Sequence, residues 1–392
     1  MWVNELKNRF IEVYGGQEED LRVFSSPGRV NLIGEHTDYN GGFVFPAALT
    51  MGSTVVARLR DDRQINLAAT DLDITVNASL DQLDNYQGLE WGSYQLGVAD
   101  ELQKAGYTLK GCDLLYDDTL PHGAGLSSSA ANEVVTALAL VTLVNEADVS
   151  RGQVDRIELA KLCQRAENNY VGVNCGIMDQ FASAMGMENH AILLDCKNLS
   201  YRLVPLNLTG YRIVITNTNK KRSLGASKYN ERRRECEAGL EALKRVLPGI
   251  SCLGDVSLTR YHRYKEVIED ETVKKRVEHV VSEDDRVLKS VDALMNNDIM
   301  QFGRLMVDSH NSLRDLYEVT GQELDTLVEE ALKIDGVIGS RMTGAGFGGC
   351  TVSIIHDEAV KEFIEKVGKN YNKKIGLNAS FYVSEVGDGA RE

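Results

Sequence analysis

A short stretch near the start of this sequence holds an unusual density of chemically different side chains. Residues 27–42 read Pro-Gly-Arg-Val-Asn-Leu-Ile-Gly-Glu-His-Thr-Asp-Tyr-Asn-Gly-Gly. Glycine lets the backbone approach a ligand closely, and a carboxylate can accept hydrogen bonds from adjacent hydroxyl groups. A charged surface loop is the alternative for any one of these residues alone. Together they predict a polar pocket for a small polyol or sugar, formed by Arg29, Glu35, His36 and Asp38.

A second stretch has the composition of a phosphate-binding loop. Residues 121–131 read Pro-His-Gly-Ala-Gly-Leu-Ser-Ser-Ser-Ala-Ala, between a strand expected over 112–116 and a helix expected from about Ser128 to Val144. Free backbone N–H groups and the helix dipole both favour an anion at a helix N-terminus. A serine that only caps the helix is the alternative, but three serines behind Gly-Ala-Gly favour a phosphate site. A serine hydroxyl can also be a ligand of Mg²⁺.

A third glycine-rich stretch lies near the end of the chain. Residues 342–350 read Met-Thr-Gly-Ala-Gly-Phe-Gly-Gly-Cys, and the Gly-x-Gly-x-x-Gly pattern within them precedes an expected strand. A dinucleotide-binding unit needs these glycines at the start of a helix, so we reject an NAD site. A tight loop between packed elements is one interpretation of the stretch, and a contribution to the same pocket is the other.

Two further carboxylates have contrasting surroundings. Asp179 follows Ile177 and Met178 directly, and a carboxylate in an apolar setting is costly unless it is paired or functional. Glu167 belongs to a helix expected over 155–171, and by itself it would be interpreted as a solvent-exposed residue.

The composition excludes several classes of protein. The chain has 392 residues, of which 43% are hydrophobic and 26% charged, so it is an ordinary globular sequence long enough for two domains. Its net charge of −15 argues against nucleic acid and anionic membranes as partners. We find no zinc-type cysteine pair, no secretory leader and no long apolar run, which predicts a cytoplasmic protein with reduced thiols.

The elements that must position these residues follow an α+β order. Strand patterns dominate the first part of the chain, and residues 271–333 are mostly helical. This order differs from repeated βαβ units. The change of pattern near residue 200 predicts two domains, an N-terminal lobe over 1–200 and a C-terminal lobe over 201–392. Short strands are expected early in the chain over 21–24, 43–49, 54–59 and 65–69.

These stretches occur in an order that resembles one known family. Gly-Arg-Val-Asn-Leu-Ile-Gly-Glu-His-Thr-Asp-Tyr-Asn at 28–40 closely resembles the galactokinase signature, and Pro-x₃-Gly-Leu-Ser-Ser-Ser-Ala at 121–130 resembles the nucleotide loop of the GHMP small-molecule kinases. Cys-Gly-Ile-Met-Asp-Gln at 175–180 and Thr-Gly-Ala-Gly-Phe-Gly-Gly-Cys at 343–350 are similar to the remaining family segments. The resemblance implies a two-lobed α+β kinase, with mixed and antiparallel sheets packed by helices and the active site between the lobes.

The resemblance also implies a role for each matching residue. Asp179 would face the sugar C1 hydroxyl, as a base or only to orient it, and Arg29 would lie beside Asp179 and stabilise negative charge. The sugar hydroxyls would be held by Glu35, His36, Asp38, Gly176 and Tyr229. ATP would be bound by Gly123, Gly125, Leu126, Ser127, Ser128, Ser129 and Trp91. Mg²⁺ would be held, directly or through water, by Ser128 and Glu167.

The resemblance predicts an enzyme that converts α-D-galactose and MgATP to galactose 1-phosphate and ADP, the first committed step of galactose breakdown. We expect it to be a cytoplasmic monomer. Two alternatives stay open, namely a kinase for N-acetylgalactosamine and a non-catalytic sensor of galactose and ATP. Known sensors of this kind are altered in the serine loop, whereas Ser129 and Asp179 are present here, which favours catalysis.

Overall fold

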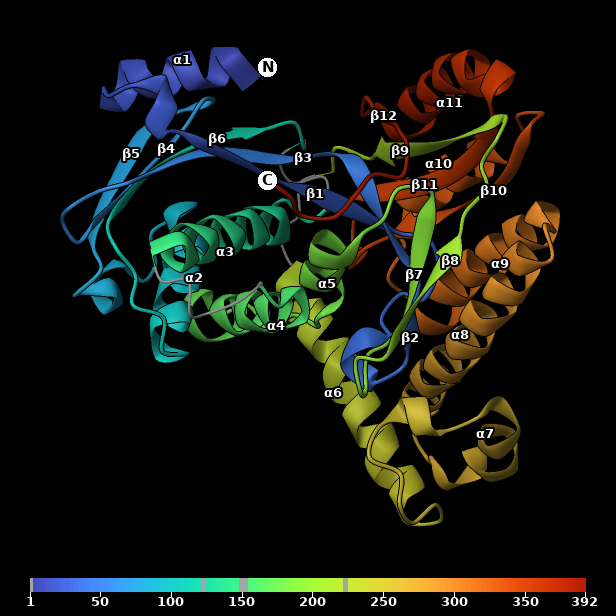
Figure 1. Cartoon of the computed structure of the whole chain (residues 1–392). Coiled ribbons are helices and arrows are strands. Elements are labelled where there is room, and N and C mark those ends of the chain that lie inside the picture. The colour runs from blue at the N-terminus through green and yellow to red at the C-terminus, as the bar shows by residue number, and fades with distance from the viewer. Residues whose placement is uncertain (1–2, 122–124, 148–153, 221–224) are drawn as a thin grey trace.

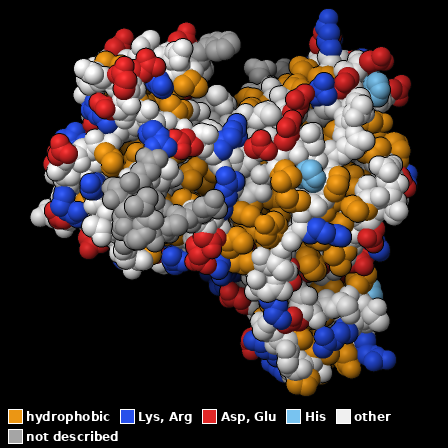
Figure 2. All heavy atoms as spheres, in the orientation of Figure 1, with side chains coloured by type: hydrophobic (Ala, Val, Ile, Leu, Met, Phe, Trp, Pro, Cys, Tyr) orange, Lys and Arg blue, Asp and Glu red, His pale blue; other side chains and the backbone are white. Residues whose placement is uncertain are grey.

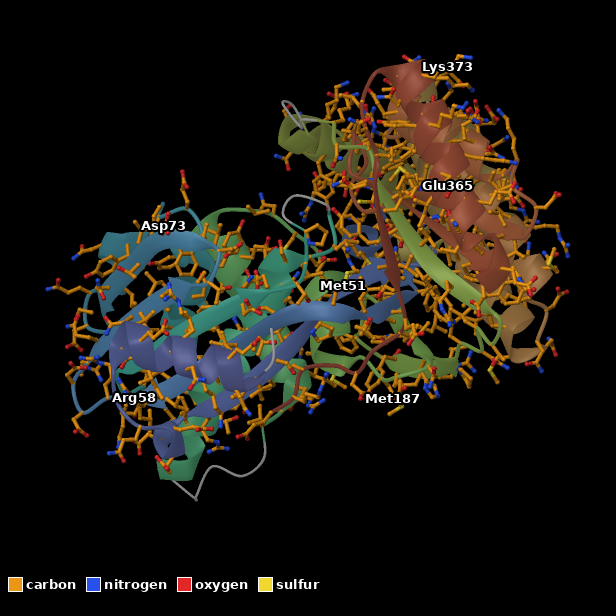
Figure 3. The ribbon with its side chains drawn as sticks, turned by 90° about the horizontal axis from the view of Figure 1, so that it is seen from above. Met51, Arg58, Asp73, Met187, Glu365 and Lys373 are labelled. Carbon is orange, nitrogen blue, oxygen red and sulfur yellow. The ribbon has the colours of Figure 1, made fainter. Side chains whose placement is uncertain are left out.

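The chain folds into two lobes that lie side by side. Seen from above, Arg58 lies on the first lobe, Lys373 lies on the second, and Met51 lies between them (Figure 3). Each lobe has its own sheet and its own helices (Figure 1), which confirms the α+β architecture expected from the sequence. The computed structural model describes residues 3–121, 125–147, 154–220 and 225–392.

The first lobe is built on a five-stranded sheet. Its elements are α1 (Val3–Tyr14), β1 (Arg22–Asn31), β3 (Pro46–Leu59), β4 (Gln64–Ala69), β5 (Leu72–Ser79), α2 (Gly92–Lys104), β6 (Cys112–Asp118), α3 (Ser128–Ala147), α4 (Arg156–Arg165) and α5 (Met178–Met185). The strand order is β1-β3-β6-β4-β5, in which β4 and β6 are parallel and the other pairs antiparallel. Helices α2, α3 and α4 cover one face of the sheet (Figure 1), where Leu114 and Val135 are fully buried. On the other face α1 buries Leu6 and Phe10, which are one helical turn apart.

The second lobe is built on a four-stranded antiparallel sheet. Its elements are β9 (Tyr211–Asn217), α6 (Gly225–Lys244), α7 (Leu258–Tyr264), α8 (Glu271–Met295), α9 (Ile299–Ser312), α10 (Gln322–Ala331), β10 (Val337–Thr343), β11 (Cys350–His356), α11 (Val360–Ile375) and β12 (Ser380–Ser384). The strand order is β10-β11-β9-β12. Successive residues of a strand face opposite sides, so Ile213 packs with the residues of α8 and α9, and Val214 packs with those of α10 and α11.

Several segments join the two lobes. A third sheet has the order β2-β7-β8, with β2 (Phe43–Val44), β7 (His190–Asp195) and β8 (Tyr201–Pro205). After β12 the chain returns to the first lobe, where Arg391 pairs with Ser25 of β1 and the C-terminus lies beside that strand (Figure 1). Val30 of β1 and Ile215 of β9 belong to one hydrophobic cluster, so the lobes share part of their core. The domain boundary near residue 200 stays a prediction.

Two elements differ from those expected. The strands expected over 43–49 and 54–59 are joined, because β3 runs without a break from Pro46 to Leu59, pairing with β1 from Pro46 to Ala57 and with β6 from Ser53 to Leu59. The helix expected over 155–171 changes at Ala166 into a π-helical segment, Ala166–Val171. Such segments are often found at functional sites, and this one contains Glu167.

The surface matches the composition. Acidic and basic side chains are interspersed over the face in Figure 2, so the net charge of −15 forms no continuous acidic field on that face. Among the residues that the structure describes, no helix combines the length and the apolar character that a membrane crossing requires.

Candidate active site

Two cavities meet between the lobes. The first has a volume of about 580 Å³ and is lined by the sugar-type stretch, the segment before α5, α6 and the third glycine-rich stretch. The second has a volume of about 470 Å³ and is lined by the serine loop and the start of α2. The third glycine-rich stretch therefore lines the same pocket as the sugar-type stretch, which was one of the two interpretations of its sequence. The two cavities share Arg29, Asp179, Gly344 and Ala345.

Arg29 and Asp179 form a bidentate ion pair where the cavities meet. Nε and Nη2 of Arg29 each donate to one carboxylate oxygen of Asp179 at 2.8 Å. Nη1 of Arg29 donates to the Gly125 carbonyl at 2.9 Å, and Ser127 Oγ donates to Oδ2 of Asp179 at 2.5 Å. The Arg29 side chain is 5% exposed and that of Asp179 is 29% exposed. All three nitrogens of the guanidinium thus donate a hydrogen bond, and the carboxylate of Asp179 stays accessible from the cavity.

The local backbone explains how these groups reach each other. The pairing of β1 with β3 shifts its register between Pro27 and Arg29, and the Arg29 N–H donates to the Leu126 carbonyl at 3.2 Å. A Cβ at Gly28 would lie 2.6 Å from that carbonyl oxygen, so only glycine allows β1 and the serine loop to come this close. Gly125 and Ser127 adopt left-handed φ values of 76° and 61°, which turn the loop into α3.

The residues predicted to hold a sugar come together around the first cavity. A Cβ at Gly176 would lie 1.8 Å from Oδ2 of Asp38, so the acid occupies the space that a side chain there would need. Tyr229 of α6 packs against the ring of His36, with 5.6 Å between the ring centroids. The lining residues include all five of those predicted, namely Glu35, His36, Asp38, Gly176 and Tyr229.

Glu35 also links two of the sequence stretches. Its Oε2 accepts from Asn31 Nδ2 at 2.8 Å, and its Oε1 accepts from the Gly344 N–H at 2.8 Å and from Arg341 at 3.3 Å. The Glu35 side chain is 2% exposed. One carboxylate therefore lines the cavity and holds the third glycine-rich stretch against the first.

Burial changes the ionisation of two neighbouring groups. Burial, with the charge of His279 as the next cause, lowers the pKa of His36 to about 3, so the imidazole is neutral at pH 7. Burial, supported by the charge of Asp179, raises the pKa of Asp38 to about 6. The cavity thus offers a neutral imidazole and a carboxyl group that is protonated more readily than usual.

Helix α8 holds the sugar-type loop from the second lobe. Oε1 of Glu283 accepts from the backbone N–H groups of Gly34 at 3.0 Å and Glu35 at 3.3 Å. Oδ1 of Asp284 accepts from the Phe43 N–H at 2.8 Å, and a ring nitrogen of His279 lies 3.1 Å from the Glu35 carbonyl oxygen. The sequence reasoning missed these three residues. Their available signal was the one-turn spacing of His279 and Glu283 on the buried face of a long helix.

Asp284 gives a prediction about pH. Burial raises its pKa from an ordinary 3.8 to about 8. A carboxyl group with a raised folded-state pKa stabilises the fold fully below its unfolded pKa, and this contribution is lost as pH rises through about 8. In Asp284→Asn the side-chain oxygen still accepts from Phe43 and nothing titrates, so the melting temperature should fall less between about pH 5 and pH 8 than in the wild type.

The neighbouring Asp285 offers the matched control for this measurement. It is 36% exposed and pairs with Lys289, so Asp285→Asn should leave the pH dependence of the melting temperature unchanged. The same pH dependence in Asp284→Asn and in the wild type would contradict the assignment to Asp284.

Most of the predicted nucleotide-binding residues line the second cavity. Trp91 immediately precedes α2, and its ring lies edge-on to Tyr116 with 6.2 Å between centroids. Its buried Nε1 has no hydrogen-bond partner among the described residues, so it can donate to a ligand. Leu126 is buried and lines neither cavity, and Gly123 lies outside the described residues. The predicted residues that line this cavity are Trp91, Gly125, Ser127, Ser128 and Ser129.

A buried group of acids lies beside the start of α3. Glu167 is 7% exposed, so its interpretation as a solvent-exposed residue was wrong, because the π-helical segment that carries it packs against α2 and α4. Gln180 Nε2 donates to Oε2 of Glu167 at 2.6 Å and to Oε2 of Glu133 at 2.9 Å. Burial, together with the charge of Asp179, raises the pKa of Glu167 to about 7, and burial also raises the pKa of Glu133. The sequence reasoning missed Glu133 and Gln180.

This donor set fits a hard cation. Oε1 of Glu133 is buried without a hydrogen-bond partner among the described residues, and two neighbouring buried carboxylates are stabilised by a positive charge. No group of three or more His, Cys, Asp or Glu side chains suited to a metal occurs in the described part of the chain. A cation here therefore needs further oxygens, such as the Ser128 hydroxyl and a nucleotide phosphate.

Comparisons with known proteins agree with this geometry. The family model "Galactokinase galactose-binding signature" matches residues 8–59, and the models for the N-terminal and C-terminal domains of GHMP kinases match 93–187 and 290–373. The chain is 51% identical to the galactokinase of Halalkalibacterium halodurans, covering 95% of this chain and 93% of that protein. It is 47% identical to the galactokinase of Clostridium tetani, covering 100% and 98%.

Solved structures extend the likeness to three dimensions. The structure of Lactococcus lactis galactokinase complexed with galactose matches with a TM-score of 0.93 and 43% identity, covering 99% of both chains. Mevalonate kinase of Methanococcus jannaschii matches with a TM-score of 0.66 and 19% identity, covering 93% of this chain and 98% of that chain, which shows the shared fold alone. The chain is a sugar kinase with the GHMP-kinase fold, and it belongs to the galactokinase family.

Proposed function

We propose that this enzyme transfers the γ-phosphoryl group of MgATP to the C1 hydroxyl of α-D-galactose, giving galactose 1-phosphate and ADP. The observation that carries the proposal is the meeting of two cavities at the Arg29–Asp179 ion pair. One cavity is lined by carboxylates and has the size of a small-molecule site, and the other adjoins a helix N-terminus. The galactokinase structure complexed with galactose supports the choice of sugar.

The carboxylates of the first cavity suit the recognition of a sugar. Glu35, Asp38 and Asp179 can each accept hydrogen bonds from adjacent hydroxyl groups. A site of this kind leaves buried polar groups unpaired when one hydroxyl is moved, so glucose, the C4 epimer, should be rejected.

Asp179 is the group that we assign to the C1 hydroxyl. It would orient this hydroxyl and accept its proton as the oxygen attacks the γ-phosphate. Arg29, held against Asp179 by two hydrogen bonds of 2.8 Å, would keep the carboxylate oriented and stabilise the negative charge of the transferring group. Phosphoryl transfer depends more on such positioning and charge stabilisation than on covalent help from the protein.

The start of α3 would bind the triphosphate. Its free backbone N–H groups and the hydroxyls of Ser127, Ser128 and Ser129 line the second cavity, and Trp91 would contact the adenine. Ser128 and Glu167 would hold Mg²⁺. The ion, when bound, neutralises charge on the phosphate oxygens.

An assay of ADP release over a small panel of sugars tests the proposal. We expect turnover with galactose, and at least ~10²-fold lower kcat/KM with glucose. Higher kcat/KM with N-acetylgalactosamine than with galactose would make the protein a kinase for that sugar. Absence of ADP release with every sugar, although galactose and ATP bind, would make it a sensor.

We also propose that the enzyme is a monomer in the cytoplasm. Both proposed substrates are small molecules, and the residues assigned to them come together within one copy of the chain. The seven cysteines are free thiols, as expected in a reducing compartment. Sedimentation velocity would test the monomer, and a concentration-dependent dimer would contradict it.

A further inference from the structure

Behind the first cavity a chain of hydrogen bonds connects four side chains. Nδ1 of His36 lies 2.8 Å from Oη of Tyr39, and Oη of Tyr39 lies 2.8 Å from Oη of Tyr317. Oη of Tyr317 lies 3.1 Å from Sγ of Cys236. Tyr317 and Cys236 are at most 1% exposed and do not line the cavity, whereas His36 and Tyr39 do. The chain therefore runs from the helices of the second lobe to the edge of the sugar cavity.

Each member of the chain has a defined protonation state at neutral pH. Burial raises the pKa of Tyr39 and of Tyr317 well above 10, and it raises the pKa of the Cys236 thiol to about 11. These three groups therefore keep their protons. His36 is neutral, so its ring carries one proton, on either Nδ1 or Nε2.

The protons of the chain can point in two directions. If they point toward His36, then Cys236 donates to Tyr317, Tyr317 to Tyr39 and Tyr39 to Nδ1, and all three protons are used. If they point away, Nδ1–H donates to Tyr39, and the buried S–H of Cys236 is left without a place in the chain. In the direction toward His36 the donor left over is Nε2–H, on a residue that lines the cavity, where a ligand can accept from it, whereas Cys236 does not line the cavity; this difference favours the direction toward His36.

The other ring nitrogen is available to a ligand. Nε2 of His36 is buried and has no partner of hydrogen-bond geometry among the described residues. With Nδ1 accepting from Tyr39, the single proton of the neutral ring lies on Nε2.

We propose that Cys236, Tyr317 and Tyr39 are positioning residues that fix His36 as the Nε2–H tautomer, so that Nε2 donates to a hydroxyl oxygen of the bound sugar. The sugar contact rests on the proposed function, whereas the tautomer in the free protein does not. Of the other groups assigned to the sugar hydroxyls, Glu35 and Asp38 are carboxylates, which accept when ionised, whereas Gly176 offers an N–H and Tyr229 a hydroxyl. A hydroxyl that donates to a carboxylate can then accept from His36, and this pairing would be lost with the other tautomer.

Nitrogen-15 NMR of the ring nitrogens tests the tautomer in the free protein. The His36 signals can be identified by their loss in His36→Gln. In the wild type we expect Nδ1 to have the shift of an unprotonated nitrogen and Nε2 that of a protonated one. In Tyr39→Phe and Tyr317→Phe the two shifts should move toward each other, because the bias on the tautomer is weakened. A protonated Nδ1 in the wild type would overturn the proposal.

Steady-state kinetics test the consequence for the sugar. Because Tyr317 lies outside the cavity, Tyr317→Phe should raise the KM for galactose roughly fivefold, the effect of about one hydrogen bond, and leave the KM for ATP unchanged. The matched control is Tyr261→Phe in an equally buried tyrosine that lines neither cavity, whose hydroxyl lies 3.1 Å from the Lys274 carbonyl oxygen and 3.3 Å from Oε2 of Glu278. This control should leave both KM values unchanged.

Two results separate the parts of the proposal. If Tyr317→Phe changes neither the tautomer nor the KM for galactose, the positioning role of the chain is overturned. If the tautomer is Nε2–H but His36→Gln binds galactose as well as the wild type, the sugar contact of His36 in the proposed function is overturned. The assay of ADP release on wild-type enzyme tests the reaction itself, so its failure is distinguishable from both.

Discussion

Replacement of Asp179 with asparagine is expected to lower kcat by at least ~10²-fold and to leave the fold intact. Asparagine cannot accept the proton of the C1 hydroxyl. It also offers one oxygen in place of the two that receive Nε and Nη2 of Arg29, so the guanidinium loses part of its bidentate contact. The measurement is the rate of ADP release at saturating galactose and MgATP. Calorimetric titration with galactose should show binding within about tenfold of the wild type, which assigns the loss to chemistry.

A second ion pair of the same geometry provides the control. Nε and Nη2 of Arg60 donate to the two carboxylate oxygens of Asp62 at 2.8 and 2.6 Å, on the exposed surface of the first lobe. Asp62→Asn removes one arginine–carboxylate pair outside the cavities, so kcat should stay unchanged. A near-normal kcat in Asp179→Asn would rule out the role of base and leave Asp179 as a residue that only orients the sugar.

The sequence was most informative where the functional residues are close together along the chain. The sugar-type stretch brings Glu35, His36 and Asp38 to one cavity because a single loop carries them, and local glycines make that loop possible. The same holds for the serine loop at the start of α3. In both places the pattern of residue types predicts the chemistry before any long-range contact is known.

The contacts that hold these loops could not be predicted in the same way. Glu283 lies 249 positions after Gly34 in the sequence, and the residues around it on α8 are mostly charged or polar. Glu167 and Glu133 are also single acids on helices, and such acids are usually exposed. Their burial arises from the packing of one helix on another, so only the folded structure distinguishes them from surface residues.

Helix α8 therefore gives the second large prediction, in which Glu283→Gln lowers stability by about 3–5 kcal/mol. Glu283 is fully buried, and it accepts from Ser309 at 2.6 Å and from Arg286 at 2.7 Å besides the loop. Burial alone would raise its pKa, but the charges of Arg286, His279 and Arg341 outweigh burial and lower the pKa to about 2. Glutamine removes the negative charge that pairs with Arg286, and it leaves Arg341 with Glu35 as its remaining carboxylate partner among the described residues.

The pH dependence of this loss follows from the lowered pKa. Glu283 stabilises the fold fully above its unfolded pKa of about 4.5, and this contribution is lost as pH falls through about 2. The difference in the free energy of unfolding between Glu283→Gln and wild type should thus be constant near neutral pH and shrink in acid. Urea denaturation at several pH values measures it. A difference that does not change with pH would show that packing, and not the charge, carries the effect.

The same substitution should weaken galactose binding, because Glu283 fixes the backbone N–H groups of Gly34 and Glu35 beside the first cavity. We expect the KM for galactose to rise at least ~10-fold, since a small displacement of a binding loop is costly. Glu271→Gln is the control on the same helix, where the side chain is 78% exposed and pairs with Lys274. It should change stability by less than about 0.5 kcal/mol and leave the KM unchanged. A normal KM for galactose in Glu283→Gln would mean that the loop keeps its shape without α8, and that Glu283 contributes to stability alone.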